Sequence, residues 1–339
     1  MVYENCCTQI TGCNIIIVLL CLLSPLLLTH CACSPTDQIE SKVLYQASQP
    51  DSVKTIHTPA FLIKEAEKEY NKIGLPSVRK AADQKTEIYV DPAQPAVFFE
   101  SQEFSTTRGR YQNLIYRIHF QKVPFSFSNI HITAGNNPGI LIIYTLDTND
   151  HLLLITTVQT CGCFLAFLPT SELPIEWFPS DWPADSQWIY GHCLPSLLHP
   201  SPIDDSEKIV FTLESETHRV CDVAVSDQDT PHDLHDTIDV KIFPMKALYH
   251  LPLSDDRTTT ESFFEMDGPR KGYVRDNTKI LERLFISWWA FDLYVGEDKA
   301  FGAADTSEIS FYTSLKFWDR EESDLKNFPR FLSYWGWKL

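Results

Sequence analysis

Apolar and polar positions in the middle of the chain follow the short period of β-strands rather than the longer period of helices. Two apolar, β-branched runs, 140–146 and 152–158, flank the polar residues 147–150, whose short side chains favour a turn. This pattern predicts a β-hairpin. A third apolar run, 164–168, follows the Cys-Gly-Cys triplet 161–163, so we expect these strands at the centre of a sheet with both faces covered.

Other strands are predicted on both sides of this hairpin. Residues 86–133 contain short alternating segments, and 114–123 alternates between apolar and polar side chains, the period of a half-buried strand. Residues 171–205 are rich in Pro, Trp and Ser and follow neither period. Further strands are predicted at 208–213, 219–225, 238–243 and 311–318.

Helices are predicted near both ends of the chain. Residues 58–73 carry a Pro at the first helical position and apolar residues at helical spacing. The clearest helix is expected at 277–294, where Lys279 and Glu282 lie away from an apolar stripe, the pattern of an amphipathic helix. That stripe consists of Leu281, Leu284, Phe285, Trp288 and Phe291. Residues 325–335 again have helical spacing.

The order of these elements predicts an α+β fold, in which a β-rich central domain with a mostly antiparallel sheet has flanking helices near the N- and C-terminal ends. The 339 residues are expected to divide into a signal peptide or membrane anchor at 1–33 and a flexible tether at 34–57. A single globular domain is expected at 58–339, and a subdivision near 245–275 is the alternative.

The N-terminal segment indicates export. Residues 15–28 are almost wholly apolar, a run shorter than the roughly 20 residues of a membrane-spanning helix and typical of the core of a signal peptide. Residues 1–14 contain Glu4 and no Lys or Arg, which departs from the positive charge at the start of most signal peptides.

Two cysteines follow this apolar run. Residues 28–30 (Leu-Thr-His) precede Cys31, and residues 30–32 (His-Cys-Ala) precede Cys33. This segment resembles the lipobox of bacterial lipoproteins, in which a Leu and two small residues precede a cysteine that is lipidated. The resemblance implies lipidation of Cys31 or Cys33, with simple cleavage or a retained anchor as alternatives. The rest of the chain is then expected to be exported and membrane-anchored in the cell envelope on the periplasmic side, with the membrane as a partner of the N-terminal segment.

The charge of the chain argues against nucleic-acid partners. There are 45 Asp and Glu against 28 Lys and Arg, which gives a formal net charge of -17. The field of such a molecule repels phosphate backbones. We therefore expect no nucleic-acid partner.

The cysteines downstream of the leader are the main candidates for chemistry. Cys161, Cys163, Cys193 and Cys221 are an even number, which in an exported protein suggests disulfides with three possible pairings. Buried free thiols are an alternative. A metal or redox site is another, with Cys161 and Cys163 on one side of a strand and His192 or Cys193 approaching from the long loop, and soft thiolates would favour Cu(I) or Zn(II).

No motif points to an enzyme class. The sequence contains no Gly-x-Ser-x-Gly elbow and no His-Glu-x-x-His, and its 12 Gly provide no phosphate-cradling loop. No cofactor or catalytic residue is predicted, and enzymatic activity is left undecided. The sequence predicts an exported envelope protein with a binding or structural role. The alternatives are a thiol-based metal-binding or redox protein that uses Cys161, Cys163 and Cys193, and a hydrolase without a recognisable motif.

Overall fold

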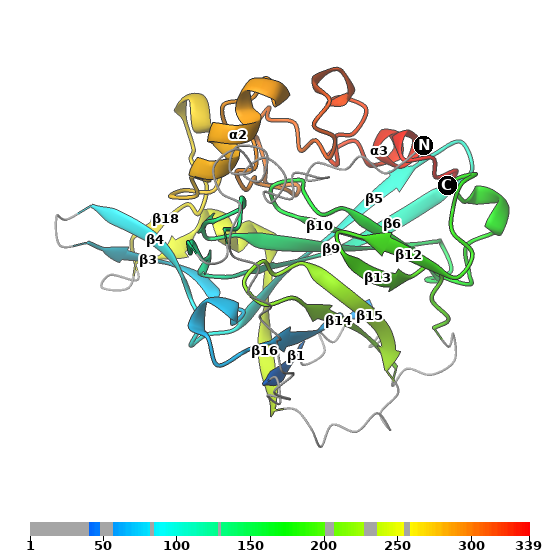
Figure 1. Ribbon diagram of the computed structural model, residues 1–339, viewed down its shortest axis with the longest axis horizontal. Coiled ribbons are helices and arrows are strands. Elements are labelled where there is room, and N and C mark those ends of the chain that lie inside the picture. The colour runs from blue at the N-terminus through cyan, green and yellow to red at the C-terminus, as the bar shows by residue number, and fades with distance from the viewer. Residues whose placement is uncertain are drawn as a thin grey trace, which may run out of the picture.

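A large, curled, mixed β-sheet dominates the protein (Figure 1). The computed structural model describes residues 41–47, 57–81, 85–127, 130–200, 207–226, 236–253 and 258–339. The predicted leader at 1–33, with Cys31 and Cys33, lies outside these residues. The strands of the main sheet, in the order in which they pair, are β11 (Ala166–Pro169), β10 (Leu152–Gln159), β9 (Gly139–Leu146), β6 (Arg110–His119), β5 (Ala96–Ser105), β16 (Asp236–Pro244), β1 (Lys42–Ala47), β2 (Ala60–Lys64), β14 (Lys208–Leu213) and β15 (Val220–Ser226).

Smaller elements lie around this sheet. Four two-stranded sheets pair β3 (Leu75–Lys80) with β4 (Thr86–Asp91), β7 (Lys122–Val123) with β8 (Gly135–Asn136), β12 (Ser186–Ile189) with β13 (His192–Pro195), and β17 (Leu251–Pro252) with β18 (Thr260–Glu261). The α-helices of the described part are α2 (Ile280–Ala290) and α3 (Phe328–Tyr334). Short 3₁₀ turns are η2 (Glu69–Asn71), η3 (Ile175–Trp177), η5 (Met245–Tyr249), η6 (Gly268–Arg270) and η7 (Phe317–Asp319).

The predicted hairpin is confirmed as β9 and β10, but with β11 it lies at one end of the strand order and not at the centre of the sheet, where the sequence predicted it. Every residue of both strands is buried, and Tyr144 pairs with Ile155 in an antiparallel register. The turn forms because the Asp147 carboxylate accepts hydrogen bonds from the backbone N–H groups of Asn149 and His151, at 2.8 and 2.9 Å. Strand β14 also coincides with a predicted segment, and β15, β16 and β11 overlap theirs.

The sheet is mixed, which corrects the expectation of a mostly antiparallel arrangement. Strand β16 lies between β5 and β1 and runs parallel to both, and β14 runs parallel to β2. The hydrophobic period identifies these segments as strands but carries no information on their partners, since parallel neighbours are joined by long crossovers. Strand β1 lies within the predicted tether at 34–57 and is hydrogen-bonded into the sheet.

The predicted N-terminal helix at 58–73 is wrong. The segment forms strand β2, then a turn at Glu65 with φ of 48°, and then only the single 3₁₀ turn η2. Phe61 and Ile63 are buried on one face of the sheet, so alternation prevails over the helical spacing. A helix and a strand both accommodate the short run Ala-Phe-Leu-Ile, and here strand pairing with β1 and β14 decides.

Curling of the sheet creates an inner core. Tyr144 on β9 and Phe211 on β14 are far apart in the sheet order, yet their ring centroids are 6.3 Å from one another. Phe61 and Ile209 pack in the same cluster of buried side chains. The two halves of the sheet therefore face each other across this core.

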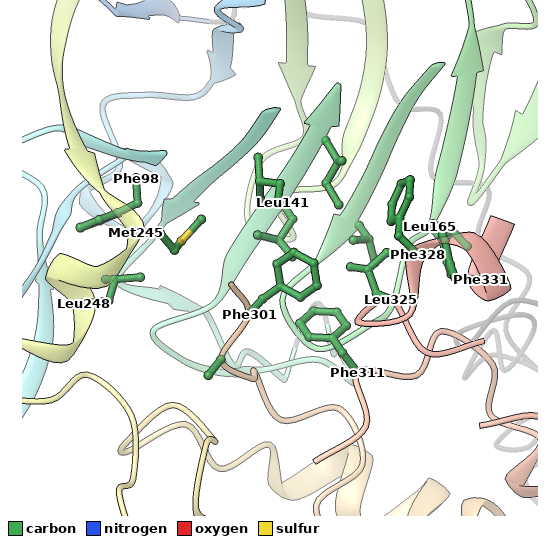
Figure 2. Close-up of a cluster of buried hydrophobic side chains, with 14 of the residues drawn as sticks. Phe98, Leu141, Leu165, Met245, Leu248, Phe301, Phe311, Leu325, Phe328 and Phe331 are labelled. Atoms are coloured by element: carbon green, nitrogen blue, oxygen red, sulfur yellow. The ribbon is translucent and has the colours of Figure 1, made fainter. Parts of the chain in front are cut away.

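A second core covers the other face of β5, β6, β9 and β10. Figure 2 shows Phe98 and Leu141 from the sheet against side chains of the C-terminal region, including Phe311, Leu325 and Phe331. The C-terminal helix is confirmed as α3, but the predicted strand at 311–318 is wrong. That segment contributes an isolated bridge from Tyr312 to Asp324 and then the turn η7.

Candidate functional site

The structure separates the cysteines that the sequence singled out. Cys161 and Cys163 lie buried in the turn between β10 and β11, whereas Cys193 is exposed on β13 and Cys221 is buried on β15. None of these four cysteines forms a disulfide with another described residue. The described residues therefore contain no disulfide that would support the pairing suggested by the sequence.

His192 and Cys221 lie near the same two charged side chains, those of Glu214 and Lys64. His192 Nε2 lies 3.7 Å from Glu214 Oε2, and Lys64 Nζ lies 3.3 Å from the same carboxylate oxygen. The Cys221 thiol donates to the Thr212 carbonyl at 3.4 Å, and burial raises its pKa to about 11. Cys221 is therefore a protonated, unreactive thiol at neutral pH.

Metal coordination by these residues stays a prediction. Within the part of the chain that is described, no group of three or more His, Cys, Asp or Glu side chains has the arrangement of a metal site.

The described residues include no helix of the length and hydropathy needed to span a bilayer.

Cys161 and Cys163 belong to a different kind of site, which we call the thiol–charge cluster. Its side chains come from the β10–β11 turn, the first turn of α2 and the segment after α2, and each is at most 3% exposed. The cluster consists of Cys161, Cys163, Lys279, Glu282, Asp298 and Lys299.

Ion pairs and hydrogen bonds hold the cluster together. Lys279 Nζ lies 3.1 Å from Asp298 Oδ2, while Lys299 Nζ donates to the backbone carbonyl of Cys161 at 2.9 Å. The Thr160 hydroxyl also donates to Asp298, and the Asp298 N–H donates to Asn277 Oδ1 at 2.9 Å. These contacts tie the turn after β10 to both sides of α2.

One thiol and one carboxyl of the cluster, those of Cys161 and Glu282, have shifted pKa values. Burial favours the neutral Cys161 thiol, but the hydrogen bond with the Cys163 thiol and the Lys279 ammonium outweigh it and lower the pKa of Cys161 to about 6. Burial raises the pKa of Glu282 to about 8, although Lys279 acts in the other direction. At neutral pH the arrangement is therefore a thiolate beside a buried ammonium and a protonated carboxyl.

A buried guanidinium borders the cluster. Arg117 Nη1 donates to the Lys299 carbonyl at 3.0 Å, and Arg117 Nε donates to His119 Nε2 at 2.8 Å. His119 Nδ1–H in turn donates to the carbonyl oxygens of Asn137 and Pro138. Burial and the Arg117 charge hold the pKa of His119 well below its usual range, so this imidazole is a neutral structural link.

Sequence reasoning missed the charged half of the cluster. It placed Lys279 and Glu282 on the wet side of a helix and did not single out Asp298 or Lys299. The one available signal is the charged triplet at 297–299, which stands between the apolar residues around it. Each residue of this triplet is 1% exposed or less.

Helix α2 exposes its large apolar side chains and buries a charged residue, the reverse of an ordinary amphipathic helix. Its buried residues are Glu282, Ile286 and Ala290, one helical turn apart, whereas Trp288 is 71% exposed. Phe317 of η7 continues the apolar area, because its ring centroid lies 5.0 Å from that of Phe291. We call this area the α2 surface; it consists of Ile280, Leu284, Phe285, Trp288, Trp289, Phe291, Leu293, Phe317 and Trp318.

The α2 surface lies on the outside of the molecule. In Figure 1, α2 stands at the margin of the fold, on the side away from β1 and β16. Arg283 is the one charged side chain of the helix that is exposed, since Glu282 points into the cluster. A monomeric protein rarely leaves so many large apolar side chains in contact with water unless they bind something.

The comparisons with known proteins leave the chain without an assigned family. No family model matches the sequence, and neither a characterised protein nor a solved structure matches it significantly.

Proposed function

We propose that the protein is an exported envelope protein that acts by binding, and that the α2 surface is the surface through which it binds a lipid bilayer. The observation that carries the proposal is the exposed apolar face of α2, where Leu284 is 65% exposed and Trp288 71% exposed. The leader with Cys31 or Cys33 supports a location at a membrane, because its sequence resembles a lipoprotein signal.

The chemistry of the α2 surface favours lipid as the occupant. Trp, Phe and Leu are the residues that interfacial helices place at the boundary between headgroups and acyl chains. Arg283 lies at the start of the helix, where its long side chain can reach the headgroups. A second copy of the chain is disfavoured, since two molecules that each carry a formal charge of -17 repel one another.

The two membrane contacts complement each other. One acyl chain gives only marginal membrane binding, and stable attachment usually takes two signals. A lipid on Cys31 or Cys33 supplies one, and the α2 surface supplies the other. Because the protein is acidic, we expect apolar burial rather than headgroup charge to drive the second contact, so neutral bilayers should bind it better than anionic ones.

Vesicle binding tests the proposal. The full chain with Cys31→Ser and Cys33→Ser is mixed with phosphatidylcholine vesicles and floated on a density gradient, and Trp288→Ser is added to the same background. Each interfacial aromatic is worth about 1.5 kcal/mol, so we expect Trp288→Ser to weaken binding about tenfold. The matched control is Trp188→Ser, because Trp188 is 75% exposed and lies on β12, outside the α2 surface.

Three results would contradict the proposal. Equal flotation of the Trp288→Ser and Trp188→Ser chains would remove the α2 surface from membrane binding. A dimer that dissociates on Trp288→Ser would show that a second copy occupies the surface instead. Unchanged membrane retention in cells of an exported chain that combines both Cys→Ser changes with Trp288→Ser would exclude the lipid anchor and the α2 contact together.

The thiol-based alternative is restricted to Cys161 and Cys163, because Cys193 lies apart from them on β13. Their contact with Lys279 favours redox chemistry over metal binding, because the cluster adds cations rather than further soft ligands.

A further inference from the structure

Cys161 and Cys163 form a pair held in fixed geometry. The Cys163 backbone N–H donates to Cys161 Sγ at 3.4 Å, and the two thiols are themselves hydrogen-bonded. Gly162 between them has a φ of 94°, and a Cβ there would overlap the Tyr312 carbonyl oxygen. The turn therefore leaves no room for a side chain at position 162 and places the Cys163 N–H against the Cys161 sulfur.

The buried positive charges around Cys161 and Cys163 favour a negatively charged thiolate. Lys279 and Lys299 are each 1% exposed, and a buried ammonium is costly unless an anion compensates it. Asp298 is the partner of Lys279, at 3.1 Å. A second negative charge beside the two ammonium groups balances the cluster, and the Cys161 sulfur is placed to carry it.

We propose that Cys161 and Cys163 are a peroxide-reactive dithiol, in which Cys161 is the attacking thiolate and Cys163 the resolving thiol. This inference does not rest on the lipid contact of α2. The substrate class is a small hydroperoxide, with hydrogen peroxide as the simplest member. Its size suits the site, because the two thiols are only 1% and 3% exposed.

The reaction balances with peroxide as the only oxidant. Cys161 Sγ attacks one oxygen, the O–O bond breaks, and the departing hydroxide takes up a proton to become water, which leaves Cys161 as a sulfenic acid. Cys163 Sγ then attacks Cys161 Sγ, the S–O bond breaks, and the hydroxide leaves as water with the Cys163 proton. Starting from the Cys161 thiolate, the protein loses two electrons and the Cys163 proton, one further proton comes from the solvent, and the peroxide is reduced to two molecules of water.

Oxidation removes the negative charge beside Lys279. The disulfide is neutral, so the Lys279 ammonium at the start of α2 keeps Asp298 as its anionic partner but loses the thiolate. The first turn of α2 is thereby less firmly held in the oxidised protein. We expect faster amide hydrogen exchange at 280–286 after oxidation.

Peptide mapping of the full chain tests the proposal. Reduced native protein is treated with limiting hydrogen peroxide at neutral pH, free thiols are then alkylated, and each cysteine peptide is quantified. A thiol with a pKa near 6 is mostly ionised at neutral pH, and the thiolate is the nucleophile, so we expect the 161–163 peptide to be oxidised about tenfold faster than the Cys193 peptide. The product should be a disulfide within that peptide.

Variants and a denatured control make the result decisive. Cys163→Ala should stop the reaction at a Cys161 sulfenic acid that dimedone traps, while the control Cys193→Ala should leave the 161–163 disulfide unchanged. In denaturant the preference for Cys161 should disappear, because it depends on the folded charges; this comparison needs no variant to fold. The proposal would be overturned if Cys193 were oxidised faster, or if the 161–163 peptide still reacted with the alkylating reagent after peroxide treatment. The same preference for Cys161 in denatured protein would also overturn it.

Discussion

His218 lies flat on Phe120, with ring centroids 3.9 Å apart and an angle of 5° between the ring planes. The imidazole is 1% exposed, and its Nε2–H donates to the Tyr70 carbonyl at 2.9 Å. The contact joins the loop before β15 to the inner core beside β6 and holds the ring away from water.

Acid should weaken the fold through His218. Burial lowers the pKa of His218 to about 3, from a usual value of 6.5 in the unfolded chain. The unfolded state binds the proton more readily, so stability is full above about pH 6.5 and falls as the pH drops towards 3, by up to about 4 kcal/mol. Urea unfolding along a pH series measures this. In His218→Phe the slope should shrink, whereas the exposed control His250→Phe should keep it; equal slopes in both would refute the assignment.

The buried ion pair of Lys279 and Asp298 should be sensitive to loss of one partner. Asp298→Asn leaves the Lys279 ammonium, which is 1% exposed, without its carboxylate, and we expect the free energy of unfolding to fall by about 3–5 kcal/mol. Glu87→Gln is the matched control, because its partner Arg79 is 52% exposed and such pairs contribute less than about 1 kcal/mol. Similar losses in the two variants would show that the cluster is not shielded from water.

Glu282 should give the opposite pH dependence to His218. Its folded pKa of about 8 lies above the usual 4.5, so its contribution is full below about pH 4.5 and is lost as the pH rises through 8. Glu282→Gln should match the natural chain near pH 5 and exceed its stability near pH 9 by up to about 4 kcal/mol. Glu103→Gln, at an exposed position on β5, is the control; a Glu282→Gln chain no more stable in alkali would contradict the prediction.

The turn between the two thiols should accept no side chain. Gly162→Ala combines a left-handed φ with a Cβ that overlaps the Tyr312 carbonyl oxygen, and we expect a loss of about 3 kcal/mol or more. Gly191→Ala is the matched control, since Gly191 has a φ of 88° and nothing within 4 Å of its Cβ position. That variant should lose only about 1 kcal/mol. Thermal unfolding of both chains compares them, and equal losses would mean that the contact with Tyr312 is not tight.

The strands were predictable wherever the deciding interactions are local. The hairpin of β9 and β10 follows from two apolar runs and the carboxylate of Asp147, which are all close in sequence. The place of β16 between β5 and β1 did not follow, because it depends on pairing with strands over 100 residues away. The segment at 60–64 was misassigned for the same reason, since its neighbours β1 and β14 decide its conformation.

The candidate site was predictable only in its thiols. Cysteine draws attention by its rarity and chemistry, whereas Lys279, Asp298 and Lys299 belong to residue types that are almost always exposed. The amphipathic pattern of α2 showed that Leu284 and Trp288 share a stripe but not which way that stripe faces. Its direction follows from Glu282 and Lys279, whose polar groups are fixed beneath the helix.

The position of β16 also sets an order on folding. This strand joins β5 to β1, so the two halves of the sheet stay separate until residue 244 has been made. Contacts of such long sequence separation form slowly. The nascent polypeptide thus keeps open strand edges until residue 244 has been made, and such edges need protection from pairing with other chains during that time.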